Sequence, residues 1–557
     1  MPNLPDKQYA VQLVGPDELV LNKSKEVYRP GRHQLLCRVE AVGLCFSDLK
    51  LLKQFSGHVR KSQIVSGVNL EVLEKIPSYV PGEAPTVPGH EAVVRIEAVG
   101  DEVSDFEPGQ RYLVQTDYRW LPTAANSNAA FGYNFEGALQ EYVLMDTRII
   151  TSPEGESMLL PVGEELSRSA IALVEPWACV EDAYASKERT GIKAGGKMLI
   201  VADNDVNERV LENLFDQYDR PGRITWVGRS APPDKLGVPV KKAADISSLP
   251  DVGFDDVIYF GSNAEIVESL FAKIGTSGLL NIVLCRGNLG REIVTPIGRV
   301  HYGGIRIIGS RGSDPAESME IIPYIDEIRQ DDKINIVGAG GPMGLMHVVR
   351  NVCQGVEGVS VFAGDVDDGR LATLSKIAEP LADKNSIWYQ TYNPTKEKVT
   401  EAFDYTALMA PIPALVSAAI KDAAPRGLIN IFAGIPATVT GQIDLDMYIE
   451  KGLYFIGTSG STLEDMKRML EKVETGRLDT NLSVAAVSGL AGAVDGIRAV
   501  ENRSIAGKII VYPACRNLGL VPLSEMDNKM PDVADCLNDG LWTKQAEQKL
   551  LEKYKVL

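Results

Sequence analysis

The sequence lacks any apolar run long enough to cross a membrane, since no window approaches the ~18 continuous apolar residues of a membrane helix. Its opening residues, MPNLPDKQYAVQL, lack the basic start and apolar run of a signal peptide. It also lacks a basic tract, because 57 Lys and Arg face 75 Asp and Glu and the net charge is −18. Binding to phosphate backbones draws on clustered Lys and Arg. We therefore expect a cytoplasmic protein with a small-molecule partner and with no nucleic-acid or membrane partner.

Cysteine is scarce as well. Seven cysteines occur in 557 residues, and no two form a C-x-x-C pair. Their odd number and their scatter along the chain exclude a disulfide framework. We expect most of them to be small buried hydrophobic residues, and a reactive or metal-binding role stays open for at least one.

The chain changes character near residue 190. Residues 1–190 are rich in short strand-like runs separated by Gly, Pro and charged turns. From residue 197 onward, buried-type strands alternate with segments of helical period, which predicts an α/β protein with doubly wound parallel sheets. At about 100–200 residues per domain, the length allows three or four domains.

The α/β pattern occurs twice. Lys197-Met-Leu-Ile-Val aligns with Lys333-Ile-Asn-Ile-Val after 333 − 197 = 136 residues, and the run at 303–312 aligns with that at 451–460 after 451 − 303 = 148 residues. The drift fits loop insertion, whereas a chance likeness between two α/β units is the alternative. We predict two tandem Rossmann-like units, at residues 191–332 and 333–470.

The last part of the chain has two pieces. Residues 471–513 predict a helix and a strand that complete the β-rich region. Residues 514–557 form a C-terminal extension that ends in an amphipathic helix, with Leu550, Leu551 and Tyr554 on one face. We expect this extension to be a packing or dimer element, and the protein to be a homodimer or homotetramer.

A glycine-rich loop follows the first strand of the second Rossmann-like unit. Gly338 suits a tight turn, Gly340 lets the backbone approach a pyrophosphate, and Gly344 allows close packing of the next helix on the strand. Asp365 follows the next strand, where a carboxylate can bind both ribose hydroxyls. Because Asp365 would repel a 2′-phosphate, we expect NAD(H) rather than NADP(H), although Arg370 is near enough to adapt the site. The predicted cofactor-binding residues are Gly338, Gly340, Gly341, Pro342, Met343, Gly344, Asp365 and Arg370.

The first Rossmann-like unit has lost this loop. At the 136-residue offset, Ala202, Asn204 and Glu208 replace the three glycines, and Asp203 and Asp205 bring negative charge to the place of the pyrophosphate. We predict that this unit binds no dinucleotide.

Three segments of the β-rich region contain side chains that can bind a metal. Cys45 follows one predicted strand, His90 precedes another, and Glu175 opens the helix that leads into the first Rossmann-like unit. Each has an ordinary explanation, as a buried thiol, a turn residue and an acid at a helix N-terminus. Together they provide the thiolate, imidazole and carboxylate of a catalytic zinc site that keeps a position open for a substrate oxygen.

The motifs around these residues resemble those of the medium-chain, zinc-dependent alcohol and polyol dehydrogenases. The shared motifs are Gly43-Leu-Cys-Phe-Ser-Asp48, Pro88-Gly-His-Glu91, the run at 136–143 and Val174-Glu-Pro176. The runs at 44–51, 341–346, 365–371, 411–416 and 457–467 are similar to the L-sorbose-1-phosphate reductase branch. The resemblance covers about residues 1–196 and 333–513, and it implies that residues 1–190 form a GroES-like catalytic domain.

The resemblance also implies roles for individual residues. Zinc-ligand positions are held by Cys45, His90 and Glu175, with Glu91 as a fourth or alternating ligand. Ser47 stands where a hydroxyl passes the substrate proton toward solvent, and Asp48 stands where a carboxylate orients His90. The implied reaction is hydride transfer between a nicotinamide and a secondary alcohol or ketone of a polyol, ketose or sugar phosphate.

Two departures from that family are visible. Many relatives have four cysteines that bind a structural zinc, but residues 91–178 contain no cysteine, so we expect one catalytic zinc and no structural zinc. The loop that contains His58, Arg60 and Lys61 looks expanded relative to the family. We interpret these bases as part of a solvated loop, with contact to a sugar phosphate as the alternative.

Two other functions stay open. One is a dehydrogenase of another secondary alcohol, such as a hydroxy acid or an amino alcohol. The other is a non-catalytic regulatory or binding protein on a dehydrogenase scaffold, which the degenerate first Rossmann-like unit suggests. The predicted metal ligands, Ser47 and the second glycine loop favour an enzyme.

Overall fold

The computed structural model describes residues 4–203, 205–229, 231–233, 236–458 and 460–556. The chain divides into two compact units. The first unit joins Met1–Ala178 to Ser461–Leu557, and the second consists of Cys179–Gly460. The C-terminal residues therefore return to the unit in which the chain begins.

An eight-stranded sheet forms the centre of the first unit. Its order is β26 (Val521–Pro522), β24 (Val484–Ser488), β25 (Lys508–Val511), β3 (Gln34–Gly43), β4 (Glu91–Val99), β5 (Arg111–Val114) and β9 (Leu159–Pro161), with β8 (Tyr142–Asp146) also paired to β3. β3 and β4 are almost entirely buried, which fits their content of Val, Leu and Ala. The antiparallel pair β25–β3 joins the two parts of the chain in one sheet.

Shorter elements surround this sheet. Two further pairs of strands are β1 (Lys7–Gly15) with β2 (Glu18–Glu26) and β6 (Asp117–Pro122) with β7 (Asn128–Ala130). The N-terminal helices are α1 (Phe46–Gln54), α2 (Leu70–Leu73), α3 (Thr147–Ile150), α4 (Arg168–Ala172) and α5 (Val174–Ala185). The C-terminal helices are α14 (Leu463–Glu474), α15 (Leu490–Glu501), α16 (Met526–Lys529), α17 (Pro531–Ala534) and α18 (Lys544–Lys553). In α18, Leu550 and Leu551 are buried, as its apolar face predicts.

The second unit contains two parallel sheets with the same strand order. The first α/β repeat is ordered β12 (Val240–Lys242), β11 (Arg223–Gly228), β10 (Lys197–Ala202), β13 (Phe254–Phe260), β14 (Ile274–Val283) and β16 (Arg306–Ser310). The second α/β repeat is ordered β19 (Trp388–Tyr392), β18 (Ser360–Gly364), β17 (Lys333–Val337), β20 (Phe403–Leu408), β21 (Ala423–Asn430) and β23 (Tyr454–Ile456). The α/β fold with two tandem parallel-sheet units is therefore confirmed.

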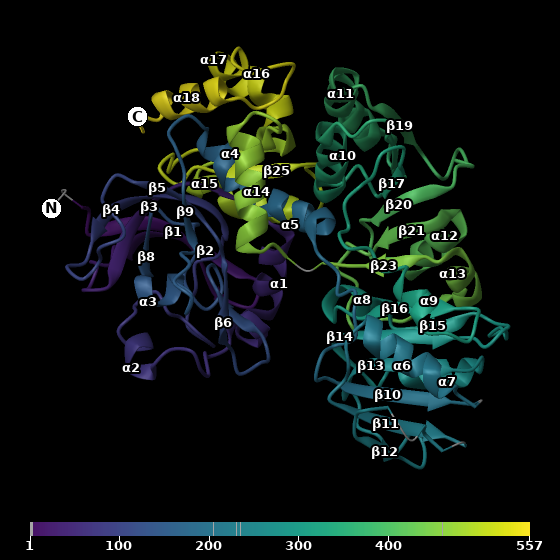
Figure 1. Cartoon of the computed structure of the whole chain (residues 1–557). Helices are drawn as coiled ribbons and strands as arrows, with labels where there is room; N and C mark the ends of the chain where they lie inside the picture. The colour runs from purple at the N-terminus through teal and green to yellow at the C-terminus, as the bar shows by residue number, and fades with distance from the viewer. Residues whose placement is uncertain (1–3, 204, 230, 234–235, 459, 557) are drawn as a thin grey trace. The chain divides into compact units, whose positions relative to one another are not determined.

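The helices of the two repeats follow the same plan. The first repeat has α6 (Glu208–Gln217), α7 (Ala264–Leu270), α8 (Ile297–Tyr302) and α9 (Ala316–Met319). The second has α10 (Pro342–Gln354), α11 (Asp368–Asn385), α12 (Pro413–Asp422) and α13 (Leu445–Lys451). In α6, Leu211, Leu214 and Phe215 form the buried face, and the Asn207 side chain caps the N-terminus. Figure 1 shows β23 and β16 as neighbours, so the two sheets meet at these edge strands.

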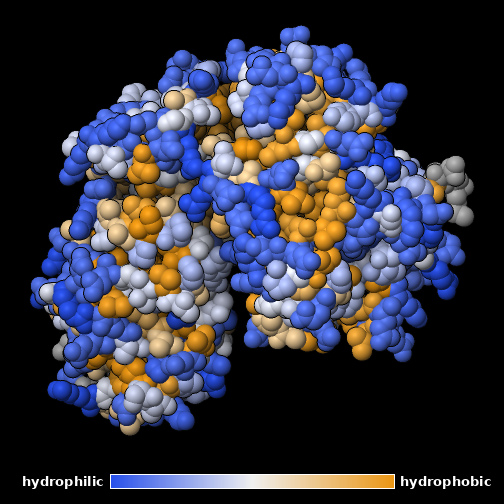
Figure 2. All heavy atoms as spheres, turned by 180° about the vertical axis from the view of Figure 1, so that it is seen from behind, coloured by the Kyte–Doolittle hydropathy of each residue, from blue (hydrophilic) through white to orange (hydrophobic). Residues whose placement is uncertain are grey.

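The surface agrees with the acidic, charged composition. Figure 2 shows hydrophilic residues over most of the face drawn, with apolar residues gathered in separate patches. Within the described part of the chain, no helix combines the length and apolarity that a membrane crossing requires. None of the seven cysteines, all of which are described, forms a disulfide, and only Cys37 and Cys515 are fully buried, so the expectation that most are buried is wrong.

Candidate metal centre and dinucleotide loop

Sheet register brings the predicted metal ligands Cys45 and His90 together. β3 and β4 pair antiparallel with Gly43 opposite Glu91. Leu44 and Cys45, which follow β3, therefore lie at the same end of the sheet as His90, which precedes β4. Ligands 45 positions apart in the sequence (90 − 45 = 45) become neighbours through this one register.

Asp48 organises both of these ligands. Cys45 is the N-cap of α1: its Sγ accepts a hydrogen bond from the Ser47 N–H, and the Cys45 N–H donates to Asp48 Oδ2 at 3.1 Å. The other oxygen, Oδ1, lies 3.1 Å from His90 Nδ1. This contact occupies Nδ1 and leaves Nε2 as the nitrogen that would coordinate a metal.

Cys45, His90 and Glu91 fit a metal ion. Their ligand atoms all lie within 4.8 Å of one another. Glu91 is fully buried, and its Oε2 has no hydrogen-bond partner among the described residues. A buried carboxylate oxygen without a donor is costly unless a cation satisfies it. The approach of Glu91 also requires Gly43, because a Cβ there would collide with the Glu91 carboxylate.

A lysine that the sequence reasoning missed joins this group of buried polar side chains. Lys508 opens β25, and its Nζ donates to Glu91 Oε1 at 2.5 Å and to the Leu44 carbonyl at 2.8 Å. Burial opposes its charge, but Glu91, Cys45 and Glu175 together raise the Lys508 pKa. The only signal in the sequence was the expected return of residues 471–513 to the β-rich region.

Glu175 lies in the same electrostatic environment but outside the tight group of three ligands. It stands in the first turn of α5 and is buried. Burial raises its pKa to about 7, with His90 opposing the shift and Glu91 adding to it. Of the four predicted ligands, the structure thus gathers Cys45, His90 and Glu91 within 4.8 Å, and Glu175 is near enough to interact with their charges.

Aromatic and hydroxyl groups surround these ligands. The Tyr133 ring centroid is 5.7 Å from that of His90 and 5.1 Å from that of His58. Burial opposes the charged form of His90, but Tyr133 and Asp48 raise its pKa well above the usual value. Ser47 is half-buried in the first turn of α1, next to Cys45.

The interpretation of His58, Arg60 and Lys61 as a solvated loop is wrong. Lys61 is 0% exposed, and its Nζ donates to the carbonyls of Val80 and Ala84. His58 is also buried, and burial lowers its pKa to about 4. The positive charge of these side chains predicts that they are exposed. The sequence does not show that backbone carbonyls satisfy the buried ammonium group of Lys61.

Arg60 forms an ion pair close to the metal ligands. Its guanidinium makes two hydrogen bonds to Asp117, at 2.5 and 3.2 Å, and lies 5.5 Å from the centroid of the Tyr133 ring. Glu175 interacts electrostatically with both members of the pair. Arg60 and Asp117 therefore belong to the surroundings of the candidate metal site.

The glycine loop has the geometry that its spacing predicts. Gly338 has φ +86°, in the region that favours glycine. A Cβ at Gly340 would lie 2.6 Å from the Arg370 Cβ, and one at Gly344 would collide with the Gly338 carbonyl. Gly341 is the N-cap of α10, with Pro342 at its first position and Met343 next. The loop therefore leaves the amide groups of the helix N-terminus available to an anion.

Asp365 is tied to this loop directly. Its Oδ2 accepts a hydrogen bond from the Gly340 N–H at 2.9 Å, and its Oδ1 accepts one from the Asp367 N–H at 3.0 Å. Arg370 Nε lies 3.7 Å from Asp367. The carboxylate predicted to bind ribose thus also holds the predicted phosphate loop in place.

The matching loop of the first repeat is built differently. Asp203 follows β10 and accepts a hydrogen bond from the Tyr259 hydroxyl, which in turn accepts one from the Asn263 N–H at 2.9 Å. Ala202 is the last residue of β10 and Glu208 the first of α6. Asn204, the counterpart of Gly340, lies outside the described residues.

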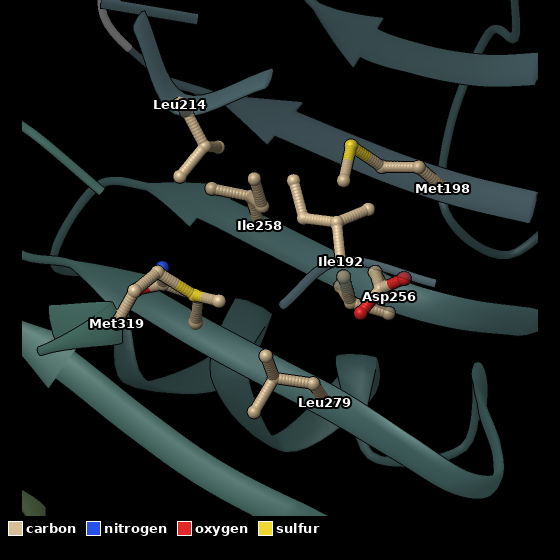
Figure 3. Close-up of a pocket in the computed structure, with 9 residues that line it drawn as sticks. Ile192, Met198, Leu214, Asp256, Ile258, Leu279 and Met319 are labelled. Atoms are coloured by element: carbon tan, nitrogen blue, oxygen red, sulfur yellow. The ribbon is translucent and has the colours of Figure 1, made fainter. Parts of the chain in front are cut away.

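A cavity in the first repeat is too small to be a substrate site. Figure 3 shows Asp256 on its wall among apolar side chains that include Met198, Ile258 and Leu279. Its volume is about 10 Å³, which is room for about one water molecule. The Asp256 carboxylate already accepts a hydrogen bond from the Arg189 guanidinium at 2.8 Å.

Comparisons with known proteins find likenesses in sequence and in fold. Residues 31–154 match the alcohol dehydrogenase GroES-like domain. An uncharacterised protein of Escherichia coli (strain K12) is 24% identical over 270 residues, which are 45% of this chain and 63% of that protein. L-sorbose 1-phosphate reductase of Klebsiella pneumoniae is 24% identical over 316 residues, which are 50% of this chain and 70% of the reductase. The solved structure of 2R,3R-butanediol dehydrogenase from Bacillus subtilis superposes with a TM-score of 0.52 at 14% identity, and the match covers 91% of this chain and 100% of that chain.

These likenesses confirm the resemblance to the medium-chain alcohol dehydrogenases that the motifs predicted. At 14% identity, the structural likeness shows the fold alone. The matched segment spans less than two thirds of the length of the E. coli relative. The chain is similar to alcohol- and polyol-dehydrogenase-type oxidoreductases.

Proposed function

We propose that this chain, with its alcohol dehydrogenase GroES-like domain, is a zinc-dependent oxidoreductase that interconverts a secondary alcohol and a ketone in a polyol, ketose or sugar phosphate. NAD(H) is the favoured cofactor. The observation that carries the proposal is the approach of the Cys45, His90 and Glu91 ligand atoms to within 4.8 Å of one another. A thiolate, an imidazole and a carboxylate form the mixed ligand set of catalytic zinc.

Each neighbouring residue has a part in this chemistry. A bound zinc supplies a Lewis acid that polarises the substrate oxygen. Cys45, His90 and Glu91 would hold the ion, with Glu175 as the further carboxylate beside them. Asp48 keeps the His90 ring oriented through Nδ1. Ser47, next to Cys45 on α1, accepts the proton of the substrate hydroxyl and passes it toward solvent.

The second repeat provides the cofactor site. The amides at the N-terminus of α10 bind the pyrophosphate, and Gly340 allows its close approach. Asp365 accepts hydrogen bonds from the ribose hydroxyls and repels a 2′-phosphate. A bound nicotinamide supplies the hydride donor or acceptor.

Charge pairing around the metal ligands favours a neutral polyol or ketose over a phosphorylated one. Arg60 is paired with Asp117, and Lys508 with Glu91. Lys61 is fully buried and bonded to carbonyls. An anionic phosphate would have to compete with these carboxylates, whereas sugar hydroxyls can hydrogen-bond to both members of the Arg60–Asp117 pair.

The test is a substrate screen combined with metal analysis. Polyols, ketoses and their phosphates are assayed at the nicotinamide absorbance with NAD and with NADP, and the zinc content of the purified protein is measured. We expect one zinc per chain, faster turnover with NAD, and higher kcat/KM for unphosphorylated substrates. Higher kcat/KM for the phosphates would overturn the substrate preference alone.

A matched variant tests the metal site. Cys45→Ala should lose both zinc and hydride transfer, whereas Cys536→Ala, at a half-buried thiol of the C-terminal extension, should keep both. Absence of zinc in the wild-type protein, or full activity of Cys45→Ala, would refute the proposed enzyme and favour a non-catalytic protein on this scaffold.

A further inference from the structure

The two α/β repeats pair with each other as if related by a local two-fold axis. Strand β15 (Ile293–Thr295) pairs antiparallel with β22 (Gly441–Ile443), with Val294 opposite Gln442. The offset between the repeats is 454 − 306 = 148 residues at the edge strands β16 and β23, and 441 − 293 = 148 at β15 and β22. At this offset Val294 corresponds to Gln442, and these two residues pair with each other. Ile293 pairs with Ile443, the counterpart of Thr295, and Thr295 pairs with Gly441, the counterpart of Ile293. Both strands therefore contribute the same positions to the contact, as in an isologous interface.

Two glycines repeat this symmetry at the edge strands. A Cβ at Gly309, the residue before the end of β16, would lie 2.8 Å from the Ile449 side chain. A Cβ at Gly457 would lie 2.9 Å from His301 Cα. These contacts are counterparts, because 457 − 309 and 449 − 301 are both 148. At Gly457 the absence of a Cβ lets the backbone of α8 approach the edge strand, and at Gly309 it leaves room for the Ile449 side chain of α13.

The contact also buries one shared apolar core. Ile293, Ile297 and Val300 of the first repeat lie in a single hydrophobic cluster with Leu445 and Tyr448 of the second, all at 0% exposure. Without the first repeat, this face of the second repeat would be open to water. Apolar faces of this kind on soluble proteins are normally covered by a partner.

Side chains at the contact break the symmetry. Arg306 and Tyr454 are counterparts, yet both bind one carboxylate: Arg306 at 2.7 and 2.9 Å and the Tyr454 hydroxyl at 2.7 Å from Glu188. Tyr448 Oη donates to the Ile307 carbonyl of β16 and accepts from the Phe455 N–H of β23, a bridge that its counterpart Val300 cannot form.

Asp446 adds a third asymmetric contact. Its carboxylate accepts hydrogen bonds from the N–H groups of Leu289 and Gly290, at 2.9 to 3.0 Å. Its counterpart is Gly298 (446 − 148 = 298), where a Cβ would collide with the Pro436 carbonyl. Neither repeat can therefore replace the other at this contact.

We propose that the first α/β repeat is a built-in partner, which covers within one chain the face of the second repeat that a second copy of a single-repeat protein would otherwise cover. It has kept the strands and glycines of the contact while its dinucleotide loop has changed. The contacts of Glu188, Tyr448 and Asp446 select this unlike pair over two like repeats. Copies of the chain consequently do not associate through this face, and a homo-oligomer would need another surface.

A disulfide across the axis tests the proposal in the full-length chain. Val294 and Gln442 are directly opposite, where Cβ atoms lie about 4.5–5.5 Å apart, so Val294→Cys with Gln442→Cys should cross-link on oxidation. We expect intact mass to show one chain that has lost two hydrogens, with peptide mapping that joins the segments around 294 and 442, at low and high protein concentration. Each single variant is the matched control and should give no such link.

The opposing result is equally defined. Covalent dimers joined through positions 294 and 442, without the intrachain link, would show that two chains meet at this face and would overturn the proposal. Gly309→Val gives a second reading, because a Cβ there would lie 2.8 Å from the Ile449 side chain of α13 and 2.7 Å from the Ile282 carbonyl of its own sheet, so the added side chain would disturb the contact between the repeats. Sedimentation velocity should then detect a concentration-dependent association beyond that of the wild-type protein at the same concentrations. If Gly309→Val fails to fold, the cross-link in the otherwise wild-type chain still distinguishes a contact within one chain from a contact between two chains.

Discussion

Asp48 binds both sides of the candidate metal centre, because one carboxylate oxygen lies 3.1 Å from His90 Nδ1 and the other accepts the Cys45 N–H at 3.1 Å. A carboxylate behind a ligating histidine fixes its tautomer and increases its basicity. The Cys45 contact in addition closes the N-terminus of α1. Local helix capping and the orientation of the predicted metal ligand His90 thus depend on the same side chain.

We expect Asp48→Asn to weaken zinc binding by about 10–100-fold, the usual effect of losing such a partner. Asparagine keeps an oxygen for the Cys45 N–H but removes the negative charge beside His90. Competition with a chelator of known affinity measures the change. Asp101→Asn, at an exposed turn of the same unit, is the control. Equal zinc affinity in Asp48→Asn and wild type would show that the contact does not support the metal.

The Lys508–Glu91 pair should be important for stability even without metal. Removing one partner from a buried ion pair costs about 3–5 kcal/mol, because the remaining charge is left uncompensated. Lys508→Met should therefore lower the Tm of the first unit in the presence of a chelator, and Lys508→Arg should lower it less. In Lys508→Met with Glu91→Gln, part of the loss should return. Additive losses in the double variant would mean that the two side chains do not act as a pair.

Cofactor binding should depend on Gly340 and not on Asn204, its counterpart in the sequence of the first repeat. Gly340→Ala places a Cβ 2.6 Å from Arg370 Cβ and 3.0 Å from Asp365 Oδ2, so the loop must shift away from its phosphate-binding shape. We expect NAD(H) affinity, measured by calorimetry, to fall below detection. Asn204→Ala, at the same position of the first repeat, should bind as wild type does. The reverse pattern would assign the cofactor to the first repeat.

The sequence was most informative where function depends on local spacing. The glycine loop and the Cys45–Asp48 turn could be predicted because all their residues lie within one strand-to-helix connection. Lys508 could not, because it is 508 − 91 = 417 residues from Glu91 and nothing local marks a buried lysine. The burial of Lys61 was missed for a related reason, since its partners are backbone carbonyls. The two-fold pairing of the repeats depends on three-residue strands, which carry no recognisable sequence pattern.

Asp326 should make the second unit less stable as the pH rises. It is 0% exposed, and burial together with the neighbouring Glu188 raises its pKa from 3.8 to about 9. The folded state therefore keeps a proton that the unfolded state releases above about pH 4, so the folded state loses stability between about pH 4 and pH 9 and no further above that. Protonated Asp326 can donate to Glu188, whose carboxylate joins Arg306 and Tyr454 of the two repeats.

Asp326→Asn imitates this neutral donor, and we expect its Tm to equal that of the wild type near pH 4 and to exceed it increasingly up to pH 9. Asp383→Asn, at an exposed position of α11, should follow the wild-type curve throughout. Parallel Tm curves for Asp326→Asn and wild type would show that Asp326 is already ionised in the folded protein.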